Sequence, residues 1–173
     1  FSAPRNLATH QQAKLVVPLL ADKGMFAPID EEASYCLMAS GGFSLTLPGS
    51  GSLYQYVLGL LNSRLLFWQL ARSSNCFRGG WVTCTKQYVS KLPIRPIDFD
   101  DPSDVAKHDR MVSLVETMLD LHKRLHDAKT KHDREIIQRQ IDATDRQIDQ
   151  LVYELYELTD EEIAIVEEAT ERG

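Results

Sequence analysis

The sequence has few cysteines and none of the short motifs that mark common catalytic sites. Its three cysteines, Cys36, Cys76 and Cys84, form no C-x-x-C pair. Free thiols in a reducing compartment are therefore expected, rather than a disulfide framework or a zinc site. There is also no G-x-G-x-x-G, no P-loop and no G-x-S-x-G. These absences argue against a catalytic role for this chain.

Long hydrophobic runs are absent as well. No apolar stretch approaches membrane-spanning length, and the N-terminus lacks the charged and apolar regions of a secretory signal. We therefore expect a cytoplasmic protein without a membrane partner. The first residue is Phe1 rather than Met, which suggests a piece of a longer protein. With 173 residues, the chain can form one compact unit with an appendage.

Charge is divided unevenly along the chain. Residues 1–97 contain nine Lys or Arg and four Asp or Glu, whereas residues 98–173 contain ten Lys or Arg and 21 Asp or Glu. The net charge of −6 thus combines +5 in the first part with −11 in the second. We predict a domain in residues 1–97 that contacts an anionic partner and a second, acidic domain in residues 98–173.

Hydrophobic patterning predicts that the first part is mixed α and β. The stretch that begins at Leu53 and includes Val57 to Leu70 is apolar nearly all round, which predicts a helix in the core. A loop ending in Gly79 and Gly80 follows it. Strand-like signals occur at residues 14–18, 25–28, 34–40, 43–47, 81–85 and 88–94.

The second part has the pattern of long helices. A boundary rich in Pro and Asp, residues 96–102, precedes two apolar seams with helical spacing. We predict two helices folded as a hairpin with its tip near Thr130, and a short final helix capped by Thr159 to Glu162. The fold class is therefore α+β. The seams are Met111, Val115, Met118 and Leu125 in one helix, and Ile137, Ile141, Ile148, Leu151, Leu155 and Leu158 in the other.

Basic residues surround the Gly79–Gly80 loop, and aromatic residues lie between them. Cationic side chains contact phosphates, arginine reads guanine edges, and glycine lets the backbone approach closely. Scattered solubilising charge is the alternative explanation, and Arg64 could simply extend from its helix to solvent. The candidate DNA-binding residues are Lys14, Arg64, Arg72, Arg78, Gly79, Gly80, Lys86 and Lys91, with Trp81 and Tyr88 interleaved.

Two other polar pairs have simpler interpretations. Asn62 and Ser63 lie among strongly apolar residues, which favours a polar contact across the core over base recognition. His122 and His126 are spaced to share one helix face, but no third metal ligand is near them in sequence. We interpret them as a polar interruption of the helix seam. No catalytic or metal-binding residue is assigned.

Three segments in this order resemble the TaqI-like C-terminal specificity domain: KLVVPLL…MFAPID…SYC, YVLGLLNSRLLFWQLA and FRGGW…TKQYVSKLPI. That family reads the DNA target within adenine-specific DNA methyltransferases and fused restriction-modification enzymes. The later segment IDQLVYELYELTDEEIAIVEE resembles the helical segment that commonly ends such proteins, with Glu157 where the usual form has glycine. The resemblance extends from about Lys14 to Glu168.

The resemblance implies that this chain recognises DNA and is not itself catalytic. A methyltransferase part would precede Phe1, carry an Asn-Pro-Pro-Tyr/Phe site and bind S-adenosylmethionine, and this chain would hold no cofactor. The implied partners are double-stranded DNA, that upstream domain and, through the long helices, a second copy in a homodimer. The family pattern supports Lys14, the Asn62–Ser63 helix end, the Gly79–Gly80 loop and Lys86 as places where DNA contacts occur.

Two alternative functions fit the same sequence. The chain could be a specificity subunit of a multi-subunit, type I-like restriction system, which shares similar recognition domains and helical spacers. It could also be a protein-interaction module whose heptad helices bind a partner without residues 1–97. If DNA is the partner, the acidic half should face away from it, because negative charge near phosphates lowers affinity.

Overall fold

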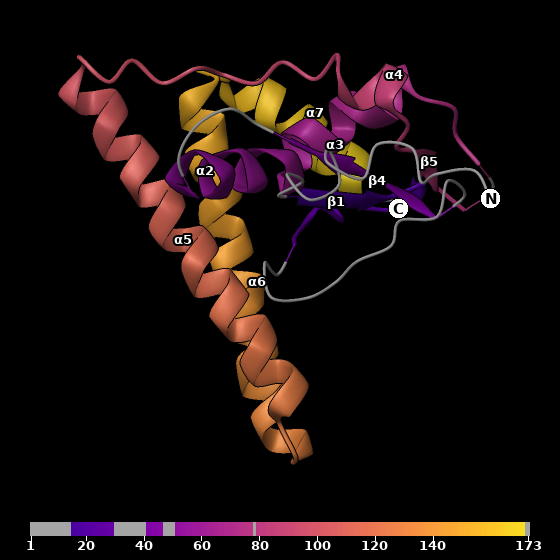
Figure 1. Ribbon diagram of the computed structural model, residues 1–173, viewed down its shortest axis with the longest axis vertical. Coiled ribbons are helices and arrows are strands. Elements are labelled where there is room, and N and C mark those ends of the chain that lie inside the picture. Colours follow the sequence, from indigo (N-terminus) through magenta and orange to yellow (C-terminus); the bar gives the residue numbers. More distant parts are fainter. Residues whose placement is uncertain (1–14, 30–40, 47–50, 78, 172–173) are drawn as a thin grey trace, which may run out of the picture.

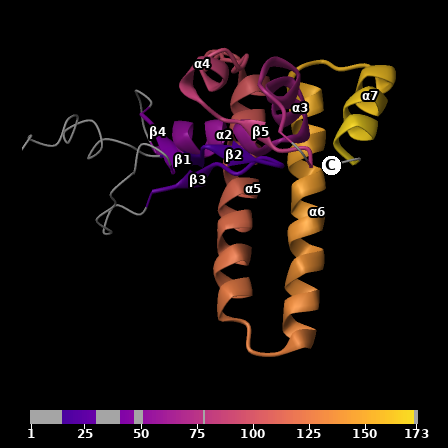
Figure 2. The same cartoon turned by 90° about the vertical axis from the view of Figure 1, so that its right-hand side faces the viewer.

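The computed structural model describes residues 15–29, 41–46, 51–77 and 79–171. It has the α+β fold that the sequence predicts, with short antiparallel strands, helices around them and a long helical hairpin (Figure 1). The strands and shorter helices form a body at one end of that hairpin, and both views show the hairpin tip projecting away from the body (Figure 2). The strand predicted at residues 34–40 lies outside the described residues.

Two small antiparallel sheets lie in the body. β1 (Leu15–Pro18) is the central strand of the first sheet, between β3 (Ala27–Pro28) and β4 (Gly42–Leu45). β2 (Leu20–Ala21) pairs with β5 (Val82–Thr83) in the second. Alternate side chains of β1 are buried, as expected for a strand with one face against the core. The predictions of strands near residues 14–18, 25–28, 43–47 and 81–85 are therefore confirmed where the structure describes them.

The strand-like segment predicted at residues 88–94 is wrong. The short helix α4 (Lys86–Val89) includes its beginning, and the chain then turns. The Ser90 N–H donates to the Lys86 carbonyl, and the Lys91 N–H donates to the Tyr88 carbonyl. These two donors are therefore satisfied within the turn rather than by a neighbouring strand. Thr85 precedes α4 in an extended conformation. The apolar residues of this segment thus pack from a helical turn rather than from a sheet.

The predicted core helix is two helices with a break between them. α2 (Gly51–Asn62) is buried around most of its second half, and α3 (Arg64–Ser73) follows after one residue. Ser63 is extended, with φ −68° and ψ 154°, and its hydroxyl oxygen accepts a hydrogen bond from the Leu66 N–H at 3.3 Å. The same hydroxyl donates to the Leu60 carbonyl at 2.7 Å. Ser63 therefore ends one helix and caps the next.

Asn62 makes the polar contact across the core that its apolar surroundings predict. Its side-chain oxygen accepts from the Phe26 N–H at 2.9 Å, and its side-chain nitrogen donates to the Phe26 carbonyl at 2.9 Å. The same nitrogen donates to the Leu58 carbonyl at 3.1 Å. The amide thus satisfies backbone groups of a loop that has no sheet partner at this point, and it has a structural role.

The helical hairpin forms as predicted. α5 (Pro102–Asp127) and α6 (Lys131–Leu155) pack along each other, and Thr130 at the tip caps α6 by accepting from the Asp133 N–H at 3.0 Å. A final helix, α7 (Asp160–Glu171), begins with the predicted reciprocal cap, which Thr159 and Glu162 form. Among the described residues, no helix is both long enough and apolar enough to cross a membrane.

One hydrophobic core extends from the body into the hairpin. The two predicted domains, 1–97 and 98–173, therefore differ in charge but share buried contacts where α2 packs on α5. Farther toward the tip, the hairpin has a small core of its own, formed by Leu121, Ile137 and Ile141. The shared core includes Leu15, Val17, Tyr56, Val57, Leu60, Leu61, Leu66 and Leu70 from the body, and Met111, Val115, Ile148, Leu151, Val152 and Leu155 from the hairpin.

Glu157 has the left-handed backbone conformation at the end of α6. Its φ is +55°, and it is the one described non-glycine residue with a positive φ. The Leu158 N–H bonds to the Tyr153 carbonyl at 3.1 Å, which closes the turn in the way typical of helix ends that use glycine here. This geometry explains physically why glycine suits the position.

We predict that Glu157→Gly raises the free energy of unfolding by about 1 kcal/mol, because glycine adopts a positive φ without the clash of a β-carbon. Glu157→Ala is the matched control. It removes the same carboxylate but keeps the β-carbon, so it should give no such gain. Urea denaturation of the three proteins measures the difference. Equal stabilisation by Gly and Ala would show that charge, rather than backbone conformation, limits stability at this turn.

Candidate nucleic-acid interface

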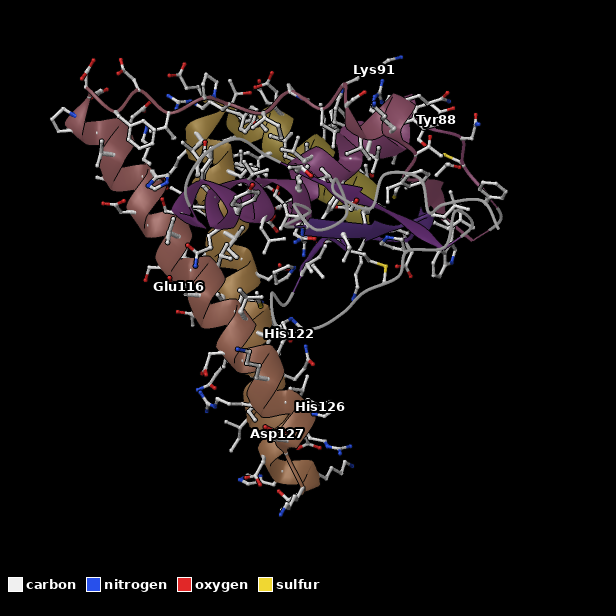
Figure 3. The ribbon with its side chains drawn as sticks, in the orientation of Figure 1. Tyr88, Lys91, Glu116, His122, His126 and Asp127 are labelled. Atoms are coloured by element: carbon white, nitrogen blue, oxygen red, sulfur yellow. The ribbon has the colours of Figure 1, made fainter. Side chains whose placement is uncertain are left out.

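Three of the predicted DNA-binding cations lie on neighbouring elements of the body. Arg72 is in the last turn of α3, Lys86 begins α4, and Lys91 follows α4. All three are exposed, and α3 packs against α4. Figure 3 shows Lys91 with Tyr88 at the α4 end of the body. We call Arg72, Lys86, Lys91 and the adjacent Gly79 and Gly80 the α3–α4 surface.

The α3–α4 surface has no acidic residue near it in sequence. Residues 33–97 contain neither Asp nor Glu. Among the described residues, the ion pairs do not include Arg72, Lys86 or Lys91. The hairpin tip lies at the opposite end of the molecule from α4 in both views (Figures 1 and 2), but it is not acidic, since residues 120–136 contain five Lys or Arg and four Asp or Glu. The acidic helix is α7, with six Asp or Glu and no Lys or Arg, and it packs against α3, so the expectation that the acidic half faces away from the basic surface does not hold for this helix. No ion pair given for the described residues neutralises these three cations, which suits contact with a polyanion.

A glycine loop joins Phe77 to Trp81 next to this surface. The Phe77 N–H donates to the Trp81 carbonyl at 2.6 Å, and Cys76 pairs with Val82 in an isolated antiparallel bridge. Gly79 and Gly80 have φ values of +83° and +80°. Two consecutive residues in this conformation favour glycine, so the pair has a backbone reason to be there. The loop is fixed at its base by hydrogen bonds, while its glycines are exposed.

Aromatic side chains accompany these cations. The Arg72 guanidinium carbon lies 4.9 Å from the centroid of the Trp68 ring, a cation–π arrangement that holds the arginine on the α3 side. Phe77 is 54% exposed and Trp81 is 39% exposed. The sequence interpretation included Trp81 but missed Phe77 and Trp68. The signal for Phe77 was its place next to the glycine loop, whereas the Trp68 contact follows from helical spacing to Arg72.

Arg64 is engaged with the helical hairpin instead of the α3–α4 surface. Its Nε lies 3.1 Å from an Asp149 carboxylate oxygen, and its backbone N–H donates to the other oxygen at 2.8 Å. Asp149 therefore lies at the N-terminus of α3, where a carboxylate interacts favourably with the helix dipole. The contact attaches α3 to α6. It also places the guanidinium away from the three exposed cations, so Arg64 has a structural partner that sequence spacing could not reveal.

Two predicted site residues, Lys14 and Arg78, lie outside the described residues. The structure thus places Arg72, Gly79, Gly80, Lys86 and Lys91 on adjoining elements and separates Arg64 from them. DNA contact by each of these residues stays a prediction. Arg95, which sequence reasoning did not select, is also engaged, since its guanidinium donates two bonds of 2.9 Å to Asp104.

The structure also contains a cavity of about 520 Å³ between the body and the hairpin. His122 lines it together with Asp142 and Asp145, and apolar side chains from α2 and α5 line much of the remainder. His126 instead contacts its neighbour Asp127 at 3.2 Å, nearer the tip (Figure 3). Among the residues described, no group of three or more His, Cys, Asp or Glu side chains is arranged to hold a metal ion.

Comparison with known proteins connects the chain to restriction-modification systems. No protein-family model and no solved structure matches it. It is 29% identical over 163 residues to the type II restriction enzyme and methyltransferase RM.Eco57I of Escherichia coli. The alignment covers 90% of this chain but only 16% of that protein, so the chain spans a small part of its relative's length. The similarity supports a restriction-modification relationship for this chain.

The Asp149 contact predicts a pH-dependent stability. Burial raises the pKa of this carboxyl to about 7, although the Arg64 backbone N–H and charge act in the opposite direction. An unfolded aspartate titrates near pH ~3.9. Between these two pH values the folded protein holds a proton that the unfolded chain has released. Its free energy of unfolding should therefore decrease with rising pH, by up to about 1.4 kcal/mol per pH unit from this group.

Asp149→Asn removes this titration but retains an oxygen that accepts from the Arg64 N–H. Urea denaturation from pH 4.5 to 8 gives the free energy of unfolding of wild type and of Asp149→Asn at each pH. Contributions of titrating groups that both proteins share cancel when one value is subtracted from the other. We expect wild type to lose stability relative to Asp149→Asn up to about pH 7 and the difference to level off above it. A difference that stays constant over this range would contradict the raised pKa.

Proposed function

We propose that this chain is a DNA target-recognition module of an adenine-specific methyltransferase in a type II restriction-modification protein. In this proposal the α3–α4 surface contacts double-stranded DNA and directs methylation to the target site. The chain itself contributes no catalytic residue. S-adenosylmethionine and the reacting groups belong to a methyltransferase domain upstream in the same polypeptide.

The observation that supports the proposal most is the placement of charge. Exposed cations on adjoining elements occur in a segment without acidic residues, and none of the three is in an ion pair given for the described residues. A protein with unpaired cations on one face can approach phosphates there. The similarity to a restriction enzyme and methyltransferase identifies DNA as the polyanion to test first.

The rigid body suits recognition because it holds these cations on packed elements. α3 is capped by Ser63 and attached to α6 through Asp149, so the end that carries Arg72 has a defined position. β5 and the bonds at the base of the glycine loop hold the backbone before α4. Phosphate contacts from such elements would position the duplex, and the glycine loop would approach the base edges. Extrusion of the target base would then give the methyltransferase domain access to the adenine amino group.

The helical hairpin has a different part in this proposal. Its base shares the core with the body, so the direction of the hairpin relative to the body is fixed. We infer that it is a spacer or a contact for the methyltransferase domain or a second copy. The alternative of an independent helical interaction module is less well supported, because removal of residues 1–97 would expose Met111, Val115 and Leu151, which the body now covers.

We predict that Arg72→Ala and Lys86→Ala each weaken duplex binding and lower its salt dependence. Loss of one phosphate contact should reduce the magnitude of the slope of log K against log salt by about 1. Fluorescence anisotropy with a labelled duplex at several salt concentrations measures both quantities. Because phosphate contacts do not depend on base sequence, the target site need not be known.

Lys129→Ala is the matched control. It removes the same charge from an exposed position at the hairpin tip and should leave both affinity and slope unchanged. If Lys129→Ala weakened binding as much as Lys86→Ala, overall charge rather than the α3–α4 surface would govern the interaction. If wild type bound duplex DNA without salt dependence, the proposed function would be wrong.

A further inference from the structure

We infer that Phe77 and Trp81 form a stacking site for an unpaired nucleobase. The inference rests on the proposed function, because it assumes that the α3–α4 surface lies against DNA. It adds a ligand chemistry that cationic contacts alone do not provide. Lys and Arg hold the phosphates, whereas two exposed aromatic rings offer a face to a base that has left the double helix.

The two aromatic residues are paired across the base of the glycine loop. The Phe77 N–H donates to the Trp81 carbonyl at 2.6 Å, so the two backbones are opposite each other. Side chains alternate along a strand, and the next residue, Val82, is turned into the core with 1% exposure. Trp81 is consequently on the outer side, with 39% exposure, and Phe77 is 54% exposed. Both rings thus present area to solvent from a backbone that is held in place.

The glycines leave space next to the indole ring. A β-carbon built on Gly79 would lie 3.7 Å from Trp81 Cδ1, which is direct van der Waals contact. A side chain extending from that carbon would cover this edge of the ring. Gly79 also has a φ of +83°, which side-chain-bearing residues rarely adopt. The loop therefore keeps the edge of Trp81 accessible to a flat ligand.

Charge favours a nucleobase over an apolar protein surface as the occupant. The aromatic pair lies between α3 and α4 in sequence, in the segment from 33 to 97 that contains no acidic residue. Arg72 and Lys86 are exposed on either side of it in sequence. Aromatic rings accompanied by cations are the combination that binds single-stranded nucleic acid, since each nucleotide brings a π-face and a phosphate. When the target adenine is extruded for methylation, the base that was paired with it is left unpaired, and that base is the occupant we propose for the stacking site.

The test compares three duplexes of the same sequence and uses the full 173-residue chain. One is fully paired, one carries a single-base bulge, and one carries an abasic residue in the bulge. The last two have the same charge and the same backbone interruption, so their ratio isolates the base. We expect wild type to prefer the bulged base over the abasic bulge by about tenfold, in line with the stacking contribution of one base.

Phe77→Ala and Trp81→Ala should each reduce this preference to less than about threefold, whereas Trp81→Phe, which retains a ring, should preserve most of it. Both alanine variants should keep the affinity and salt dependence of wild type for the fully paired duplex. Each alters an exposed side chain, and circular dichroism verifies the fold. Binding of the bulged base should also quench Trp81 fluorescence, and Trp81→Phe, which leaves Trp68 as the other tryptophan, should lose that quenching.

The outcomes separate this inference from the proposed function. Salt-dependent duplex binding with no preference for the bulged base would overturn the stacking site and leave the DNA-binding surface intact. The absence of salt-dependent binding to any duplex would overturn the proposed function. If the alanine variants left every DNA affinity unchanged but altered self-association in sedimentation, the aromatic pair would be a protein contact, and the inference would be wrong.

Discussion

The arrangement of the molecule depends on the helix break at Ser63. An uninterrupted helix from Gly51 to Ser73 would continue in one direction through the core. The Ser63 hydroxyl instead donates to the Leu60 carbonyl in the last turn of α2 and accepts from the Leu66 N–H in the first turn of α3, so it provides one capping hydrogen bond to each helix. Asp149 then accepts from the Arg64 N–H and fixes the start of α3 against α6. Buried α2 can therefore anchor the hairpin while α3 carries Arg72 to the surface.

This geometry does not separate the whole acidic part of the chain from the basic body, because the acidic helix α7 packs against α3. The core shared by α2, α5 and α6 fixes the direction of the hairpin, so its tip, where five Lys or Arg and four Asp or Glu lie in residues 120–136, points away from α4. The net charge of −6 does not describe the α3–α4 surface, because residues 33–97 contain no Asp or Glu. The basic surface and the fixed loop together suit contact with DNA phosphates.

The sequence predicted features that depend on periodicity and missed those that depend on distant contacts. The hairpin followed from the repeated isoleucines and leucines, and the cap of α7 from Thr159 and Glu162. Periodicity did not reveal the Ser63 break, because apolar residues continue on both sides of it, and only the family resemblance indicated a helix end at Asn62–Ser63. The helical turn of α4 has too few residues to establish a period. Arg64 was selected by charge, yet its partner Asp149 is far away in sequence, and only folding brings them together.

We propose that the α3–α4 surface, and not the hairpin tip, faces DNA. Amide chemical shifts of the isotope-labelled chain, recorded while a duplex is titrated at low salt, test it directly. The account predicts that the largest perturbations occur for residues 72–91, with little change for residues 120–136 at the hairpin tip. Perturbations concentrated at the tip, with residues 72–91 unaffected, would contradict it.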